Sequence, residues 1–157
     1  ELSLDKFTLS NGSYGFVDLP FGQSQSEIEE QLSITFDNSQ QTAENIVLCA
    51  LPDYYQYDGQ PVRLSLEFNQ DALRTLMFTI SSDDAADEIY NDVADSLTEL
   101  YGQPTETIEN DGSQQNGISG MGIRWNSTSG TSTSLQVILM SGDQIEPTVS
   151  IGVGLLE

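Results

Sequence analysis

Alternating hydrophobic and polar residues predict β-strands in the middle of the chain. Residues 62–68 alternate strictly, and residues 73–80 repeat the alternation after a polar turn at 69–71. This pattern predicts an antiparallel hairpin with one face in water. Residues 44–51 are almost all apolar, which is typical of a strand covered on both faces.

Further strands are predicted near the N-terminus and in the last third. Residues 6–18 hold two short apolar stretches around a turn, typical of a leading hairpin or edge strand. In residues 149–155, apolar side chains alternate with Ser150, Gly152 and Gly154. This alternation predicts a final strand whose small-residue face is approached closely by a neighbour. The remaining strand candidates are residues 105–109, 121–126 and 134–140, the last apolar on both faces and therefore expected to be central.

Two stretches have the spacing of helices. Residues 83–101 repeat apolar side chains every three or four positions, and Gly102 and Pro104 then end the pattern. Residues 24–32 form a shorter helix that begins with a capping box of Ser24 and Glu27. The predicted fold is therefore α+β: an antiparallel sheet with one long amphipathic helix (83–101) packed on one face and a short helix (24–32).

Residues 1–157 are expected to form a single domain, because no linker-like change of composition interrupts the pattern. A faint rhythm of one helix followed by three strands occurs twice, over residues 20–80 and 83–155, without repeating individual residues. The role of residues 110–157 is not indicated by any motif.

The charge is strongly one-sided: 25 acidic and 4 basic residues give a formal net charge of −21. This charge disfavours nucleic acids and anionic membranes as partners. It suits a cationic protein, divalent cations or solubility alone. On the predicted long helix, the polar face is almost purely negative: Asp84, Asp87, Glu88, Asp92, Asp95 and Glu99.

The chain contains no histidine, which excludes Ser-His-Asp and Cys-His centres and histidine-bearing zinc sites. Its one cysteine, Cys49, lies in an apolar run and is predicted to be a buried hydrophobic residue. We therefore expect no enzymatic activity, no cofactor and no metal ligands. Two alternatives stay open: a calcium- or small-ligand-binding domain, and a hydrolase that uses paired carboxylates.

The most unusual local feature is a tyrosine-rich stretch between two predicted strands, Pro52 to Gly59. Tyrosines on a connecting loop supply rigid contact area of the kind that protein recognition sites use. The alternative is that they cover the sheet edge. The candidate binding residues are Asp53, Tyr54, Tyr55, Tyr57 and Asp58. Trp125 is expected to fill the core instead.

Residues 19–28, Leu-Pro-Phe-Gly-Gln-Ser-Gln-Ser-Glu-Ile, resemble the opening of small bacterial envelope modules, in which a strand leads into a short helix. The later alternating strands, long helix and Leu100-Tyr101-Gly102-Gln103-Pro104 extend the resemblance over about two thirds of the chain. The chain thus resembles secreted or lipid-anchored envelope proteins of Gram-positive bacteria. It is more distantly similar to outer-membrane assembly lipoproteins and β-lactamase-inhibitor-like modules.

This resemblance implies a non-enzymatic, extracytoplasmic protein-interaction or scaffold module, secreted or lipid-anchored by a signal upstream of residue 1. It supplies no site residues. Oligomeric state and the identity of the partner are not indicated, and no segment of the sequence is apolar enough for membrane insertion.

Overall fold

The computed structural model describes residues 2–9, 12–36, 39–110, 119–128, 130, 132–142 and 145–155, except for the side chains of residues 52–54, 110 and 145. One antiparallel sheet runs through this part of the chain, in the order β1-β2-β3-β4-β8-β7-β6-β5. The strands are β1 (Gln40–Ala43), β2 (Ile46–Tyr57), β3 (Gln60–Asn69), β4 (Ala72–Ser81), β5 (Glu106–Asn110), β6 (Ser119–Asn126), β7 (Thr133–Gly142) and β8 (Ile145–Leu155).

Two α-helices and one short 3₁₀ helix accompany the sheet: η1 (Leu4–Lys6), α1 (Gln25–Leu32) and α2 (Ala86–Tyr101). The predicted α+β class with an antiparallel sheet is confirmed. At α1, Ser24 and Glu27 form the predicted capping box. Helix α2 begins later than the predicted residue 83, because the Ser82 hydroxyl accepts a hydrogen bond from the Ala85 amide and holds the intervening residues in a turn.

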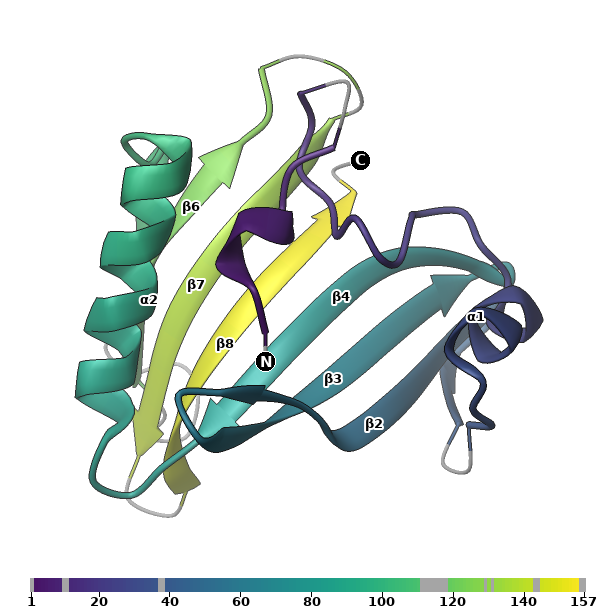
Figure 1. Ribbon diagram of the computed structural model, residues 1–157, viewed down its shortest axis with the longest axis horizontal. Helices are drawn as coiled ribbons and strands as arrows, with labels where there is room; N and C mark the ends of the chain where they lie inside the picture. The colour runs from purple at the N-terminus through teal and green to yellow at the C-terminus, as the bar shows by residue number, and fades with distance from the viewer. Residues whose placement is uncertain are drawn as a thin grey trace.

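The element order is one helix followed by four strands, twice, and the two halves meet where β4 pairs with β8. The sequence pattern indicated three strands after each helix. It missed β1, whose residues Gln-Gln-Thr-Ala are all exposed and show no apolar alternation. Figure 1 shows α1 beside β2 and β3 on one side of the molecule and α2 along β6 and β7 on the other.

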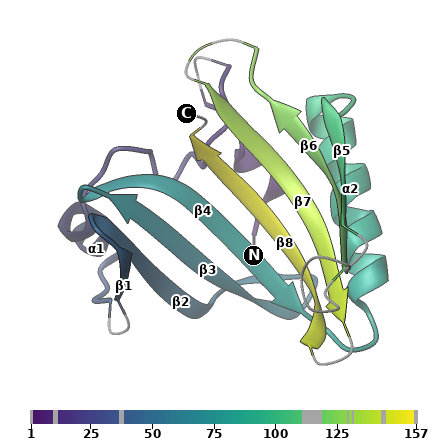
Figure 2. The same ribbon diagram turned by 180° about the vertical axis from the view of Figure 1, so that it is seen from behind.

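The sheet has two different faces. Its inner face packs against α2, α1 and the N-terminal segment, and it carries fully buried side chains such as Leu64, Phe78 and Ile151. Its outer face points away from both helices, which lie behind the strands when the sheet is viewed from that side (Figure 2). The core is therefore a single layer between the inner face and the elements that cover it.

One prediction about strands was wrong. Residues 44–51 are not covered on both faces, because β2 lies near the sheet edge and Leu48 on its outer face is 36% exposed. Of the two alternatives for residues 6–18, the described part of the segment fits the short hairpin: Thr8 and Tyr14 form an antiparallel bridge, and the Leu9 amide donates to the Ser13 carbonyl across 2.8 Å. None of its described residues forms an edge strand of the sheet. Their apolar side chains, among them Phe7 and Phe16, instead enter the core.

Trp125 and Cys49 are both in the core, as predicted. Trp125 is 1% exposed, and its indole N–H donates to the Gly102 carbonyl across 2.8 Å. Cys49 is buried, with its sulfur 3.2 Å from the Ser39 hydroxyl. Burial raises the pKa of the Cys49 thiol, with a smaller opposing effect from Ser39.

We expect the Cys49 thiol to react slowly in the folded protein, because burial and a raised pKa both reduce the exposed thiolate. An aromatic disulfide reagent should modify native protein at least about a hundredfold more slowly than guanidinium-unfolded protein. Equal rates in the two states would show that β2 opens readily and that Cys49 is not held in the core.

Candidate binding surface

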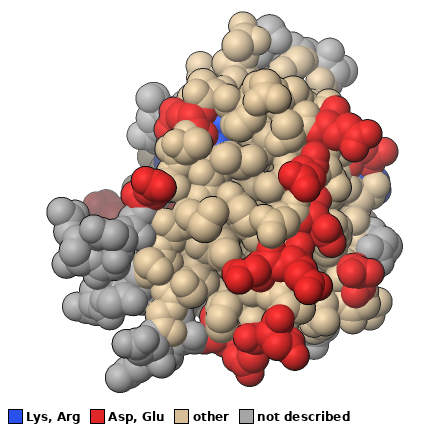
Figure 3. All heavy atoms as spheres, turned by 90° about the vertical axis from the view of Figure 1, so that its left-hand side faces the viewer, with Lys and Arg blue, Asp and Glu red and all other residues tan. Residues whose placement is uncertain are grey.

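Helix α2 presents a continuous row of carboxylates to solvent, which we call the acidic face. Figure 3 shows the acidic side chains gathered on this side of the molecule. All of them are exposed, while the opposite side of α2 packs Ile89, Val93 and Leu97 against the sheet. The members of the acidic face are Asp83 and Asp84 in the turn before α2, and Asp87, Glu88, Asp92, Asp95 and Glu99 on the helix itself.

The acidic face destabilises its own helix. Glu88 and Asp92, like Asp95 and Glu99, are four residues apart, and like charges at that spacing repel. Acids near the N-terminus of a helix interact favourably with its dipole, but Asp95 and Glu99 lie toward the C-terminal end, where cations are favoured. The last turn of α2 contains no basic residue. Helix stability therefore does not account for these acids.

No described basic side chain neutralises the acidic face. The ion pairs within the described ranges join Lys6 to Asp18, Arg74 to Glu67, and Arg124 to Glu106. None of these carboxylates belongs to α2. The acidic face is thus a concentrated negative surface with its charges directed to solvent.

The tyrosine-rich stretch forms strand where the sequence suggested a loop. Strand β2 continues to Tyr57 and joins β3 through a two-residue turn of Asp58 and Gly59. Both turn residues have positive φ, 50° and 79°, as the tight hairpin turn requires. The prediction of a connecting loop was wrong because tyrosine fits an extended strand well, and Asp-Gly alone completes the turn.

The five candidate binding residues separate into different environments. Tyr55 faces inward and makes edge contacts with Phe16 and Phe78 at ring distances of 6.0 and 5.7 Å, so it contributes to packing. Tyr57 is half-buried and Asp58 is exposed at the end of the hairpin. The side chains of Asp53 and Tyr54 lie outside the described residues.

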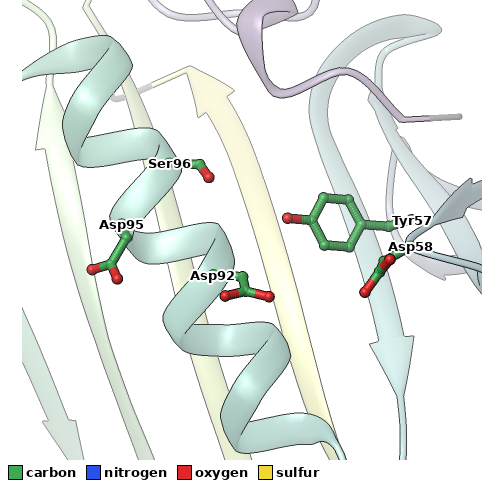
Figure 4. A pocket seen from close by; sticks show the side chains of 5 residues that line it. All are labelled: Tyr57, Asp58, Asp92, Asp95 and Ser96. Atoms are coloured by element: carbon green, nitrogen blue, oxygen red, sulfur yellow. The ribbon is translucent and has the colours of Figure 1, made fainter.

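The hairpin end and α2 border a hollow of about 430 Å³, lined by Tyr57, Asp58, Asp92, Asp95 and Ser96. In Figure 4, the Tyr57 hydroxyl points toward α2, and Asp92 and Ser96 point from α2 toward the hairpin. Asp95 points away, toward the outer side of the helix.

Tyr57 reaches this hollow because it occupies an inward-facing position at the projecting end of β2, opposite Gln60 of β3. The hollow joins two features that the sequence presented separately, the tyrosine-rich stretch and the negative helix. Nothing in the local pattern indicated that they meet, because their proximity depends on how α2 packs on the sheet.

This arrangement suits the side chain of a lysine or arginine. A cation can lie among carboxylates while its hydrocarbon stem or guanidinium plane rests against the Tyr57 ring. Among the described residues, no three acidic or cysteine side chains group closely enough to hold a metal ion.

No described helix is long and apolar enough to cross a membrane. Comparison of the chain with models of known protein families, with curated proteins and with solved structures finds no match.

Proposed function

We propose that this protein is a non-enzymatic interaction module that binds a cationic protein through the acidic face and the adjoining end of the β2–β3 hairpin. The proposal treats α2 as an amphipathic helix whose apolar side anchors it to the sheet and whose negative side receives the partner. The extracytoplasmic setting stays a prediction, based on the resemblance of residues 19–28 to envelope modules.

The observation that carries the proposal is the repulsion within the acidic face. Carboxylates repel one another along α2 and no described basic side chain compensates them. A lysine- or arginine-rich partner would relieve this repulsion on binding, because it supplies the positive charges that the free helix lacks. The hollow beside Tyr57 supplies a position where one cationic side chain can be recognised individually.

A short fluorescent oligolysine peptide provides the test. We expect the double variant Asp92→Asn/Asp95→Asn to bind it roughly threefold to tenfold more weakly than the wild type, since each exposed charge contributes modestly. A higher salt concentration should also weaken the binding of the peptide to the wild type. Fluorescence anisotropy titrations at two salt concentrations measure both effects.

The matched control is Glu30→Gln/Glu44→Gln, which removes the same charge from exposed positions on α1 and the β1–β2 turn. It should lose clearly less affinity than the α2 variant. The α2 variant should also melt no lower than wild type, because it relieves like-charge repulsion. Equal losses of affinity in both variants would mean that only the net charge attracts cations, and would contradict a localised binding surface.

A further inference from the structure

The outer face of the sheet is almost uncharged, although the chain as a whole carries a net charge of −21. Both helices lie on the other side of the strands (Figure 2). In the central part of this face, β3 carries the charged side chains Arg63 and Glu67, Arg74 lies beside Glu67, and Arg124 of β6 donates to Gln136. Small or hydroxyl-bearing residues otherwise predominate. The set is Arg63, Ser65, Glu67, Thr75, Met77, Thr79, Ser81, Ser134, Gln136, Ile138, Met140, Thr148, Ser150, Gly152 and Gly154.

Arg63 is exposed and forms no ion pair with a described residue, although the chain contains 25 acids. The other basic residues, Lys6, Arg74 and Arg124, all pair with carboxylates. Glu67 makes two long contacts: it lies 3.8 Å from the Arg74 guanidinium, too far for a hydrogen bond, and accepts a hydrogen bond of 3.5 Å from the Thr75 hydroxyl. The outer face therefore offers Arg63, which has no described ion-pair partner, and Glu67, whose contacts are long.

These two charges are placed symmetrically on β3. Arg63 and Glu67 lie two residues to either side of Ser65 and point to the same face. Ser65 in turn is level with Met77 of β4, and Met77 with Gly152 of β8. Consider two copies whose outer faces meet, related by a two-fold axis that lies between the sheets and runs parallel to this row. Such an axis reverses the strand direction and therefore brings the Arg63 of each copy over the Glu67 of the other.

We propose that the outer face is the interface of a symmetric dimer of this chain, with the two sheets packed face to face about that axis. Met77, which is 37% exposed, then meets its own counterpart at the axis. The row through Thr79 and Ser150 faces the row through Thr75 and Gly154, so uncharged, mostly small side chains face one another. Such a surface allows sheets to approach to about 10 Å.

We choose a second copy as the occupant because its charge distribution and the area of its outer face both suit this surface. Two copies that each carry −21 repel strongly, and the outer face is where they can meet without opposing their acidic faces. The six strands that have at least seven residues, β2, β3, β4, β8, β7 and β6, span a flat area of roughly 670 Å² at ~4.8 Å between strands and ~3.3 Å per residue. A standard interface buries about 800 Å² per partner. In this dimer the two acidic faces point outward, in opposite directions.

Sedimentation equilibrium tests the dimer at chain concentrations from about 10 µM to about 500 µM. We expect dimerisation to strengthen when NaCl rises from about 50 mM to about 500 mM, because salt screens the net repulsion. Binding of the oligolysine peptide must weaken over the same range. The opposite salt dependences therefore separate the test of the dimer interface from the test of the acidic face, and one proposal can be overturned while the other holds.

Substitutions locate the interface. Met77→Glu should weaken the dimer at least about tenfold, because it places two carboxylates together at the axis. The control Val17→Glu adds the same charge at a position that is 53% exposed in the N-terminal segment, which covers the inner face and not the outer one, and it should have a much smaller effect.

Charge reversal tests the axis itself. Arg63→Glu and Glu67→Arg should each weaken self-association, and mixing the two variants should restore dimers, since both opposed pairs then carry opposite charges. Circular dichroism checks that each variant is folded. A monomer at every concentration and salt, a dimer unaffected by Met77→Glu, or failure of the mixture to recover would each overturn the proposal.

Discussion

Replacing Phe78 by alanine should lower the free energy of unfolding by about 3–5 kcal/mol, the range for removing a fully buried aromatic side chain. Phe78 is 0% exposed on the inner face of β4. Its ring contacts those of Phe7, Phe16 and Tyr55 at centroid distances of 5.5, 4.9 and 5.7 Å. Phe7 and Phe16 belong to the N-terminal segment, so the cavity would also release that segment from the sheet.

Equilibrium unfolding in urea, followed by circular dichroism, measures this loss. The control Met121→Ala removes a side chain that is 49% exposed and should change the stability by less than about 1 kcal/mol. If Phe78→Ala behaved like the control, the aromatic cluster would not be what attaches the N-terminal segment.

Replacing Tyr101 by phenylalanine should lower the stability by about 1–3 kcal/mol, because two backbone groups lose their partner. The Tyr101 hydroxyl donates to the Leu4 carbonyl across 2.7 Å and accepts from the Phe7 amide across 3.1 Å. It thereby ties the last residue of α2 to η1 and the chain that follows it. Thermal melts near neutral pH measure the change.

The same substitution should alter the response to alkali. Burial raises the pKa of Tyr101 above its usual value near 10, with smaller opposing effects from hydrogen bonds. Because the folded protein holds this proton more tightly than the unfolded chain, the stabilisation is complete below about pH 10 and is lost as pH rises through the folded pKa.

Melts between about pH 8 and pH 11 should therefore show a steeper alkaline loss for the wild type than for Tyr101→Phe. Burial also raises the pKa values of Tyr14 and Tyr90, so the variant should still decline. Parallel curves would indicate that the Tyr101 hydroxyl is not held in the folded protein as described.

The sheet was predictable where one face is buried and the other is not. In β3 and β4, strict alternation indicated the hairpin and the side chains that enter the core, because burial imposes a period of two. Strand β1 was not predictable, since an exposed edge strand buries nothing and leaves no pattern. For residues 6–18, the turn between two apolar stretches indicated the short hairpin that Thr8 and Tyr14 form, but not that Phe7 and Phe16 enter the core beneath the sheet.

The candidate site was only partly predictable. The charge of α2 and the tyrosines near Asp58 were visible as separate features, but their meeting depends on contacts between segments that are far apart in sequence. Tyr55 was also misjudged. In the strand its side chain points inward and contacts Phe16, but the prediction of a loop gave no basis for assigning it to the inner face. Small residues at alternate positions of the last strand predicted a face that a neighbour approaches closely, and a Cβ on Gly154 would lie only 3.1 Å from the Thr75 hydroxyl oxygen.

We propose that a cationic partner binds the acidic face and the adjoining hairpin end. The most direct test is an NMR titration of isotope-labelled protein with the oligolysine peptide, in which every assigned backbone amide reports its own environment. We expect chemical-shift changes to concentrate on α2 around Asp92, Asp95 and Ser96 and on Tyr57 and Asp58 at the hairpin end. Changes spread evenly over all acidic segments, or confined to α1 and the outer face of the sheet, would contradict it.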